Sequence, residues 1–169
     1  GMPYLFFKDT VNKMNPNKHD GMIGSGNLCQ ESFSNFSPTK VGNVTINEKT
    51  GKINQESDSG YIHTCNLVSL NLSLLLDRET LAKSCSVAVK ILDNTIDLTV
   101  TPIAESNLHN NHYRTIGVGA MGLADYLAIN HLPYKGDSGT LEEVDKLFEF
   151  IAYNVVKTSA DLAIEKGAY

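Results

Sequence analysis

Long apolar stretches are absent from the sequence. No run approaches the roughly 20 apolar residues that a membrane-spanning helix needs, so we expect no membrane association. Residues 1–4 have neither the basic start nor the apolar core of a signal peptide, and the expectation is a cytoplasmic location. The formal net charge of −5 argues against a general nucleic-acid binder, which would show a basic face.

Cysteine is also scarce. The three cysteines are Cys29, Cys65 and Cys85, and a small, odd number in a cytoplasmic chain argues against a disulfide scaffold. No pair has the C-x-x-C spacing of a zinc or thioredoxin-like site, and we predict that this segment binds no metal or cofactor. Each cysteine must therefore be judged from its neighbours.

What is present is enough for a folded domain. The chain has 169 residues, of which 41% are hydrophobic and 20% charged, ordinary values for a globular protein with a core. Apolar residues at helical spacing predict a helix over 79–98. Its apolar stripe comprises Leu81, Cys85, Ala88, Val89, Leu92 and Ile96. Cys85 is therefore interpreted as a small buried hydrophobic residue.

A second long helix is predicted near the end of the sequence. Thr140 should cap its start, with Glu143 completing a capping box, and Gly167 should end it. The predicted buried face comprises Leu141, Val144, Phe148, Ile151, Val155 and Leu162.

Short strands should alternate with these helices. The strands are predicted at residues 3–7, 61–70 and 114–118, and shorter helices at 9–14, 104–110 and 121–129. Residues 41–47 and 52–55 flank a Lys-Thr-Gly turn, which predicts an exposed hairpin. The alternation indicates an α/β fold with mostly parallel strands and crossover helices.

Polar side chains lie at alternate positions around Cys29. In an extended segment over 27–33, Asn27, Cys29 and Glu31 would point to the same face. Such a face suits the edge of a ribose, with the thiol at its centre. The glycines within residues 21–26 would let the backbone approach a ligand closely. The spacing alone is also compatible with a buried cysteine beside a solvated glutamate.

Residues 117–122, G-V-G-A-M-G, fit the pattern of a dinucleotide-binding turn. Asp137 lies 20 residues after Gly117, but the residues before it indicate a loop rather than the second strand that such a site requires. Close packing of a strand against a helix is the preferred explanation for these glycines. A nucleotide-binding oxidoreductase built on this motif remains the alternative.

Three histidines require a separate explanation. His109 and His112, with Glu105, could lie on one helical face, but so polar a stretch favours a solvated surface over a metal site. His63 shares a side of its segment with Cys65 and could tune that thiol, although a satisfied core histidine is the preferred interpretation.

Several segments resemble one known family in the same order. Asn-Leu-Cys-Gln-Glu at residues 27–31 resembles the active-site loop of ribonucleotide reductase catalytic subunits. Further resembling segments are residues 3–16, 64–72, 93–97, 114–125 and 163–169. Because an ordered series is more specific than any single motif, the chain resembles a central segment of the large subunit.

The resemblance implies roles for individual residues. Cys29 would carry the thiyl radical that takes hydrogen from C3′ of a ribonucleotide. Glu31 would act as general base on the 3′-hydroxyl, and Asn27 would hold the sugar. Cys65 would be one member of a redox cysteine pair, and Leu67 would help line the substrate site. The implied reaction reduces ribonucleotides to deoxyribonucleotides for DNA synthesis.

The resemblance also implies that further parts are needed. Residues 1–169 would be a single segment of a ten-stranded α/β barrel, without the N-terminal allosteric domain, the other barrel strands and the C-terminal redox tail. The implied partners are the rest of the large subunit, a radical-generating small subunit with a metal centre (or a cobalamin instead), and thioredoxin or glutaredoxin. We expect the isolated chain to be inactive and oligomeric. A non-catalytic assembly piece remains an alternative to a catalytic segment. Whether diphosphates or triphosphates would be reduced also remains open.

Overall fold

A computed structural model describes residues 3–169. By its internal contacts the chain divides into two compact units. The first unit runs to Cys65 and includes Thr99–Thr115, and the second comprises Asn66–Leu98 and Ile116–Tyr169. Among the described strands, one pair is antiparallel and the other is parallel, so the prediction of mostly parallel strands holds for only one of the two pairs.

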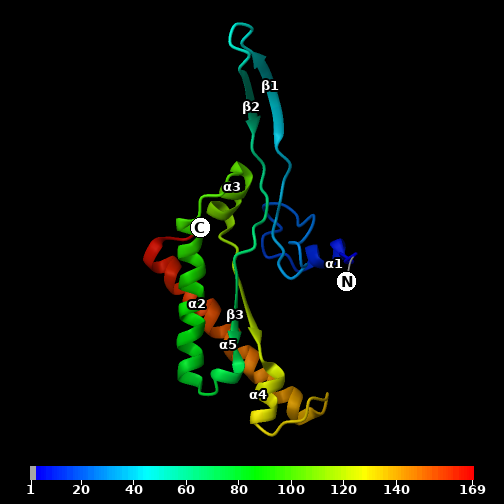
Figure 1. The fold of residues 1–169 in the computed structure, drawn as a ribbon. Helices are drawn as coiled ribbons and strands as arrows, with labels where there is room; N and C mark the ends of the chain where they lie inside the picture. The colour runs from blue at the N-terminus through cyan, green and yellow to red at the C-terminus, as the bar shows by residue number, and fades with distance from the viewer. Residues whose placement is uncertain (1–2) are drawn as a thin grey trace. The chain divides into compact units, whose positions relative to one another are not determined.

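The second unit is built on the parallel pair. Strand β3 (Leu67–Asn71) pairs with β4 (Gly117–Met121), and their register runs from Leu67 opposite Gly117 to Asn71 opposite Met121. The long helix α2 (Arg78–Leu98) follows β3 after a short 3-10 turn at Leu72–Leu74. Helices α4 (Leu123–Ile129) and α5 (Ser138–Lys166) follow β4. Helix α2 lies beside the strand pair (Figure 1), and α5 packs against α2. The strands predicted over 61–70 and 114–118 therefore begin later than expected.

The apolar stripe of α2 forms the centre of this unit. All six residues of the predicted stripe are buried, which confirms the helical spacing as the signal. Three of them, Leu81, Cys85 and Ala88, pack with residues from both strands and from α4 and α5. Burial also raises the pKa of the Cys85 thiol, which keeps it in the unreactive protonated form and agrees with a purely structural role.

Helix α5 begins and packs differently from the prediction. Asp137 is its N-cap, and its carboxylate accepts a hydrogen bond of 2.9 Å from the Thr140 amide. The predicted capping box is wrong because Glu143 instead accepts a hydrogen bond from the Tyr126 hydroxyl. The buried residues are Thr140, Leu147, Ile151 and Thr158.

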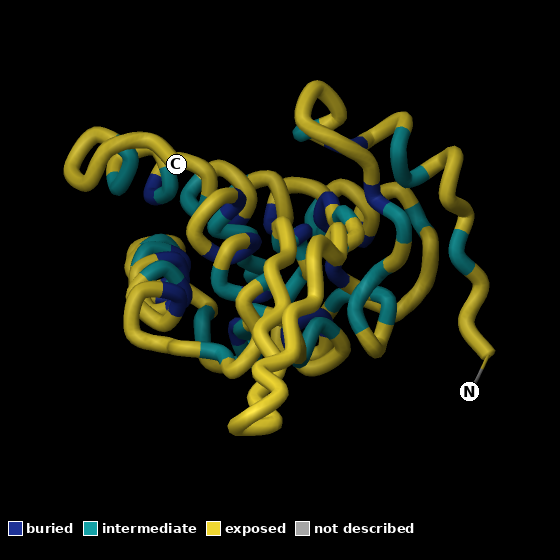
Figure 2. Tube along the Cα trace, turned by 90° about the horizontal axis from the view of Figure 1, so that it is seen from above, coloured by how far each residue is buried: buried dark blue, intermediate teal, exposed yellow. Residues whose placement is uncertain are grey.

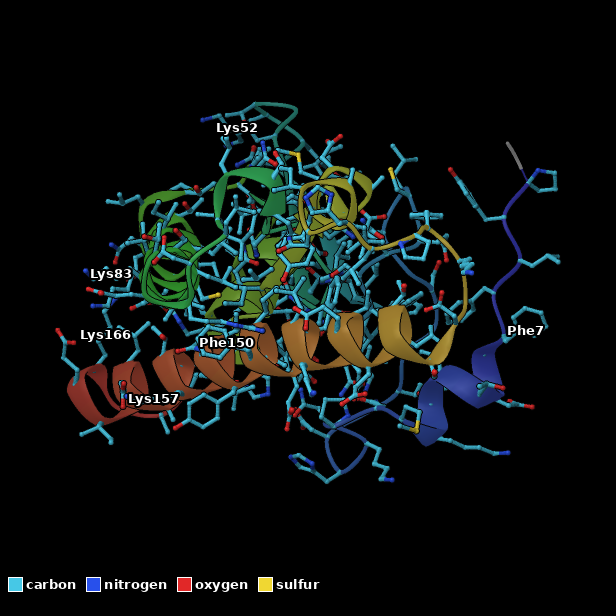
Figure 3. All side chains as sticks on the ribbon, turned by 90° about the horizontal axis from the view of Figure 1, so that it is seen from below. Phe7, Lys52, Lys83, Phe150, Lys157 and Lys166 are labelled. Carbon is cyan, nitrogen blue, oxygen red and sulfur yellow. The ribbon has the colours of Figure 1, made fainter. Side chains whose placement is uncertain are left out.

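Two predicted members of the buried face of α5, Leu141 and Phe148, are exposed. The helix does end at Gly167, as predicted. In its last turn, Lys166 reaches the carboxylates of Asp93 (2.5 Å) and Asp97 (3.2 Å), which joins α5 to the last turns of α2. Figure 3 labels Lys166 at the C-terminal end of α5.

The first unit contains short elements and long irregular segments. Its elements are α1 (Lys8–Lys13), the strands β1 (Lys40–Ile46) and β2 (Ile53–Asp58), and α3 (Ala104–Tyr113). Strands β1 and β2 form the predicted hairpin, and every residue of both is exposed (Figure 2). The strand predicted over 3–7 is wrong, because these residues have no pairing partner in the described chain.

Candidate functional site

The residues around Cys29 form a closed turn rather than the predicted extended segment. The Gln30 amide donates to the Asn27 carbonyl at 3.1 Å, which closes a β-turn. The Asn27 side-chain oxygen accepts hydrogen bonds from the amides of Glu31 (3.0 Å) and Ser32 (3.1 Å). Asparagine favours this arrangement because its short amide can satisfy nearby backbone donors. We call residues 27–32 the Asn27 turn.

The turn places the Asn27 side chain at the centre of the predicted site. Its Nδ2 donates to the Glu31 carboxylate at 2.7 Å and lies 2.7 Å from the Cys65 sulfur. One amide therefore joins a carboxylate four residues away to a thiol that is 38 residues away in sequence. Asn27, Glu31 and Cys65, all singled out by the sequence, are thus brought together. The extended, alternating geometry by which Asn27 and Glu31 were grouped with Cys29 was wrong.

Cys29 lies within the same turn and is exposed, as are Glu31 and Cys65. Gln30, between Cys29 and Glu31, has a φ of 63°, a left-handed conformation that is costly for a residue with a Cβ. Its side-chain amide donates to the Asn27 carbonyl at 2.8 Å, which helps to hold that conformation. Strained backbone of this kind concentrates at functional sites, where the surroundings enforce it.

The glycines before the turn have a different use from the one predicted. At Gly24, an added Cβ would lie 1.8 Å from the ring of Phe36, so the missing side chain makes room for this ring. The close approach predicted for a ligand is therefore taken, at this position, by a side chain of the same unit. Phe36 also lines a pocket of about 230 Å³, together with Ser25, Gly26, Ser34, Ile62 and His63.

Two serines, one at the end of the turn and one just after it, bind two histidines, a feature that the sequence prediction missed. The Ser32 hydroxyl lies 2.8 Å from Nε2 of His63, and the Ser34 hydroxyl lies 2.9 Å from Nε2 of His109. Both serines are buried, and His109 is fully buried. Ser34 also contacts the hydroxyl of Thr115 at 3.1 Å. The only available signal was serine at alternate positions directly after the motif.

The predicted solvated surface around His109 is therefore wrong for that residue. Burial, with a smaller contribution from His63 nearby, lowers the pKa of His109 to about 4. His112, by contrast, is partly exposed and pairs with the Asp20 carboxylate at 2.6 Å. Glu105 accepts a hydrogen bond from the Thr39 hydroxyl. Across the described residues, no group of three potential metal ligands is found.

The depressed pKa of His109 predicts a loss of stability in acid. Between pH 6.5 and about 4 the unfolded chain binds a proton that folded His109 does not, so stability should fall as pH falls through this window. The full loss is about 3–4 kcal/mol. His109→Gln should flatten the change in urea midpoint between pH 7 and pH 5, measured by circular dichroism. Exposed His19→Gln is the control, and an unchanged slope in the His109 variant would contradict the assignment.

Comparison with known proteins matches the whole chain to one family. The family model described as ribonucleotide reductase, barrel domain, matches residues 1–169. The chain belongs to the ribonucleotide reductase barrel-domain family. A ribonucleoside-diphosphate reductase subunit alpha from Synechocystis sp. is 50% identical over 169 residues, covering 100% of this chain and 19% of that protein. The corresponding subunit from Treponema pallidum is 38% identical over 173 residues, covering 100% of this chain and 20% of the relative.

The fold agrees with this family. The alpha subunit of a class Id ribonucleotide reductase from Actinobacillus ureae superposes with a TM-score of 0.65 at 21% identity, over 99% of this chain and 30% of that one. The chain therefore has the fold of part of such a subunit. It spans about a fifth of the length of the two relatives above.

The glycine motif of this family member serves packing. Gly117 lies opposite Leu67 in the strand pair, and an added Cβ there would lie 2.4 Å from the Leu67 side chain. The close contact is thus between two strands, rather than between a strand and a helix as predicted. Asp137 caps α5 and follows a loop, so the second strand of a dinucleotide site is missing from the described residues.

No described helix is long and apolar enough to cross a membrane.

Proposed function

We propose that this chain supplies the radical and redox cysteines of a ribonucleotide reductase catalytic subunit. The observation that carries the proposal is the Asn27 side chain, which lies 2.7 Å from both the Glu31 carboxylate and the Cys65 sulfur. A base, a hydrogen-bond donor and a reducing thiol are the groups needed at one edge of a ribose. Cys29 lies in the same turn, between Asn27 and Glu31 in sequence.

The proposed reaction uses these groups in sequence. A thiyl radical on Cys29 takes the hydrogen atom from C3′, a step that sulfur makes reversible because S–H and activated C–H bonds are similar in strength. Glu31 accepts the 3′-hydroxyl proton, and the 2′-hydroxyl takes a proton from one thiol of a redox pair and leaves as water. That pair is Cys65 and one cysteine outside this chain. The other thiol gives its hydrogen atom to C2′; the pair then passes its remaining electron to the 3′-carbonyl carbon and becomes a disulfide, while Glu31 returns its proton to the 3′-oxygen. Cys29 then returns its hydrogen to C3′.

Residues outside this chain complete the site in this proposal. The exposed Glu31 and Cys29 would be enclosed by the remaining strands of a ten-stranded barrel, to whose substrate site Leu67 would contribute. The radical would come from a metal-containing small subunit or from cobalamin, and thioredoxin or glutaredoxin would reduce the disulfide. A cytoplasmic location, an oligomeric state and the ribonucleotide substrate are parts of the same proposal.

Substitution of Asn27 in the complete catalytic subunit tests the proposal. Asn27→Ala removes the donor to Glu31 and Cys65 and opens the turn, so kcat for deoxyribonucleotide formation should fall by about 10²-fold. Asn27→Asp keeps the turn-closing oxygen but adds a charge beside Glu31, and it should also be impaired. Exposed Asn43→Ala, in the hairpin, is the control.

The isolated chain, assayed in parallel, should show no turnover. Full activity of both Asn27 variants, or reduction by the isolated chain without added subunits, would contradict the proposed function.

A further inference from the structure

The Asn27 turn is attached to the segment that carries Cys65 at two points. The first is the contact between Asn27 and the Cys65 sulfur. The second is the hydrogen bond between the Ser32 hydroxyl and His63, two residues before Cys65. The first contact uses a thiol that the proposed reaction oxidises, whereas the second uses no reacting group. Only the second can therefore persist unchanged through a catalytic cycle.

Ser32 is well placed to transmit this attachment to the turn. Its amide donates to the Asn27 side-chain oxygen at 3.1 Å, and its carbonyl accepts from the Asn27 amide at 3.1 Å. The residue is buried, so its hydroxyl has little access to water as an alternative partner. Fixing the Ser32 hydroxyl therefore fixes the closing end of the turn, next to Glu31.

His63 itself packs against a fully buried histidine. Its ring packs against that of His109 with centroids 5.3 Å apart, and His109 is anchored by Ser34 at 2.9 Å. Burial lowers the pKa of His63, so the ring is neutral at pH 7 and offers one donor and one acceptor nitrogen. Its Nδ1 is buried without a hydrogen-bond partner among the described residues, which leaves the bond at Nε2 to Ser32 to fix the ring.

We propose that His63 is a positioning residue for the radical-bearing loop, because through Ser32 it holds the Asn27 turn on the Cys65 segment. This inference rests on the proposed function of Cys29 and Glu31. Neither His63 nor Ser32 touches the reacting atoms in it. Their contribution is the geometry of the turn, and a displacement of about 1 Å at a reacting group is enough to cost about 10²-fold in rate.

A double-mutant cycle in the complete catalytic subunit, assayed with its radical-generating partner, tests this proposal. Ser32→Ala and His63→Ala each remove the same hydrogen bond, so each should lower kcat by about 10-fold to 10²-fold while KM changes by less than about 3-fold. Because the two residues act as one unit, the double variant should be no slower than the slower single variant.

Two further variants separate positioning from general destabilisation. His63→Gln carries an amide nitrogen that can replace Nε2, so it should recover most of the lost kcat. His131→Ala, at an exposed histidine of the second unit, should leave kcat unchanged. If His63→Ala fails to fold, Ser32→Ala decides the question, since it removes one oxygen atom.

Unchanged kcat in Ser32→Ala, or additive losses in the double variant, would overturn the proposal. Cys29→Ser, assayed in parallel, identifies which hypothesis has failed. If Cys29→Ser is inactive and the Ser32 and His63 variants are normal, only the positioning role is wrong. If Cys29→Ser is fully active, the proposed function itself is wrong.

Discussion

Replacing Cys29 with serine in the complete catalytic subunit should reduce deoxyribonucleotide formation to background. Serine is nearly the same size, and Cys29 is exposed in this chain, so the turn should keep its shape. The O–H bond of serine is much stronger than the S–H bond of cysteine. A serine oxygen would therefore not carry the radical that the proposed reaction requires.

The measurement is product formation together with substrate affinity. Affinity for the ribonucleotide should stay within about 3-fold of the parent, because a residue that acts only on the transition state leaves ground-state binding intact. Cys85→Ala is the matched control, since it removes a cysteine from the core of the second unit rather than from the turn. It should lower stability slightly and leave kcat unchanged. Retained turnover in Cys29→Ser would remove Cys29 from the mechanism.

Leu81→Ala should have the largest effect on stability. Leu81 is 1% exposed on α2 and packs in the cluster formed by the strands and by α4 and α5. Removing a fully buried leucine costs about 2–5 kcal/mol, from lost burial and from the cavity that remains. For a unit of this size that is a large fraction of the total stability.

Urea unfolding followed by circular dichroism measures this effect, because the chain has no tryptophan to report by fluorescence. Leu98→Ala makes the same chemical change at the end of the same helix, where the side chain is 84% exposed. It should shift the unfolding free energy by less than about 0.5 kcal/mol. Equal shifts for the two variants would mean that the stripe of α2 is not the core of the unit.

Helical periodicity was the most reliable signal in the sequence. The stripe of α2 was predicted residue by residue because a long amphipathic helix repeats its apolar positions many times. The start of α5 was harder to predict, since Asp137 and Thr140 are both good N-cap residues and only the surrounding chain selects one. Thr140 is not the N-cap residue, because its hydroxyl donates to the Pro133 carbonyl.

Short strands were predicted less well for a related reason. A five-residue strand has few repeats, and its limits depend on its partner. Strand β3 extends only as far as β4 pairs with it, from Leu67 to Asn71. Residues 3–7 are apolar and aromatic, but within the described chain they have no partner and form no strand.

The sequence by itself determined the family and the long helices, and it predicted Asn27, Cys29, Glu31 and Cys65 as candidate site residues. These depend on residue identity and local order, which the chain carries directly. Only the tertiary structure decided how Asn27, Glu31 and Cys65 meet, because a turn between near neighbours and a contact across 38 residues depend on how the chain folds back. The same folding buried His63 beside Ser32, and a hydrogen bond between residues 31 apart leaves no periodic signal in the sequence.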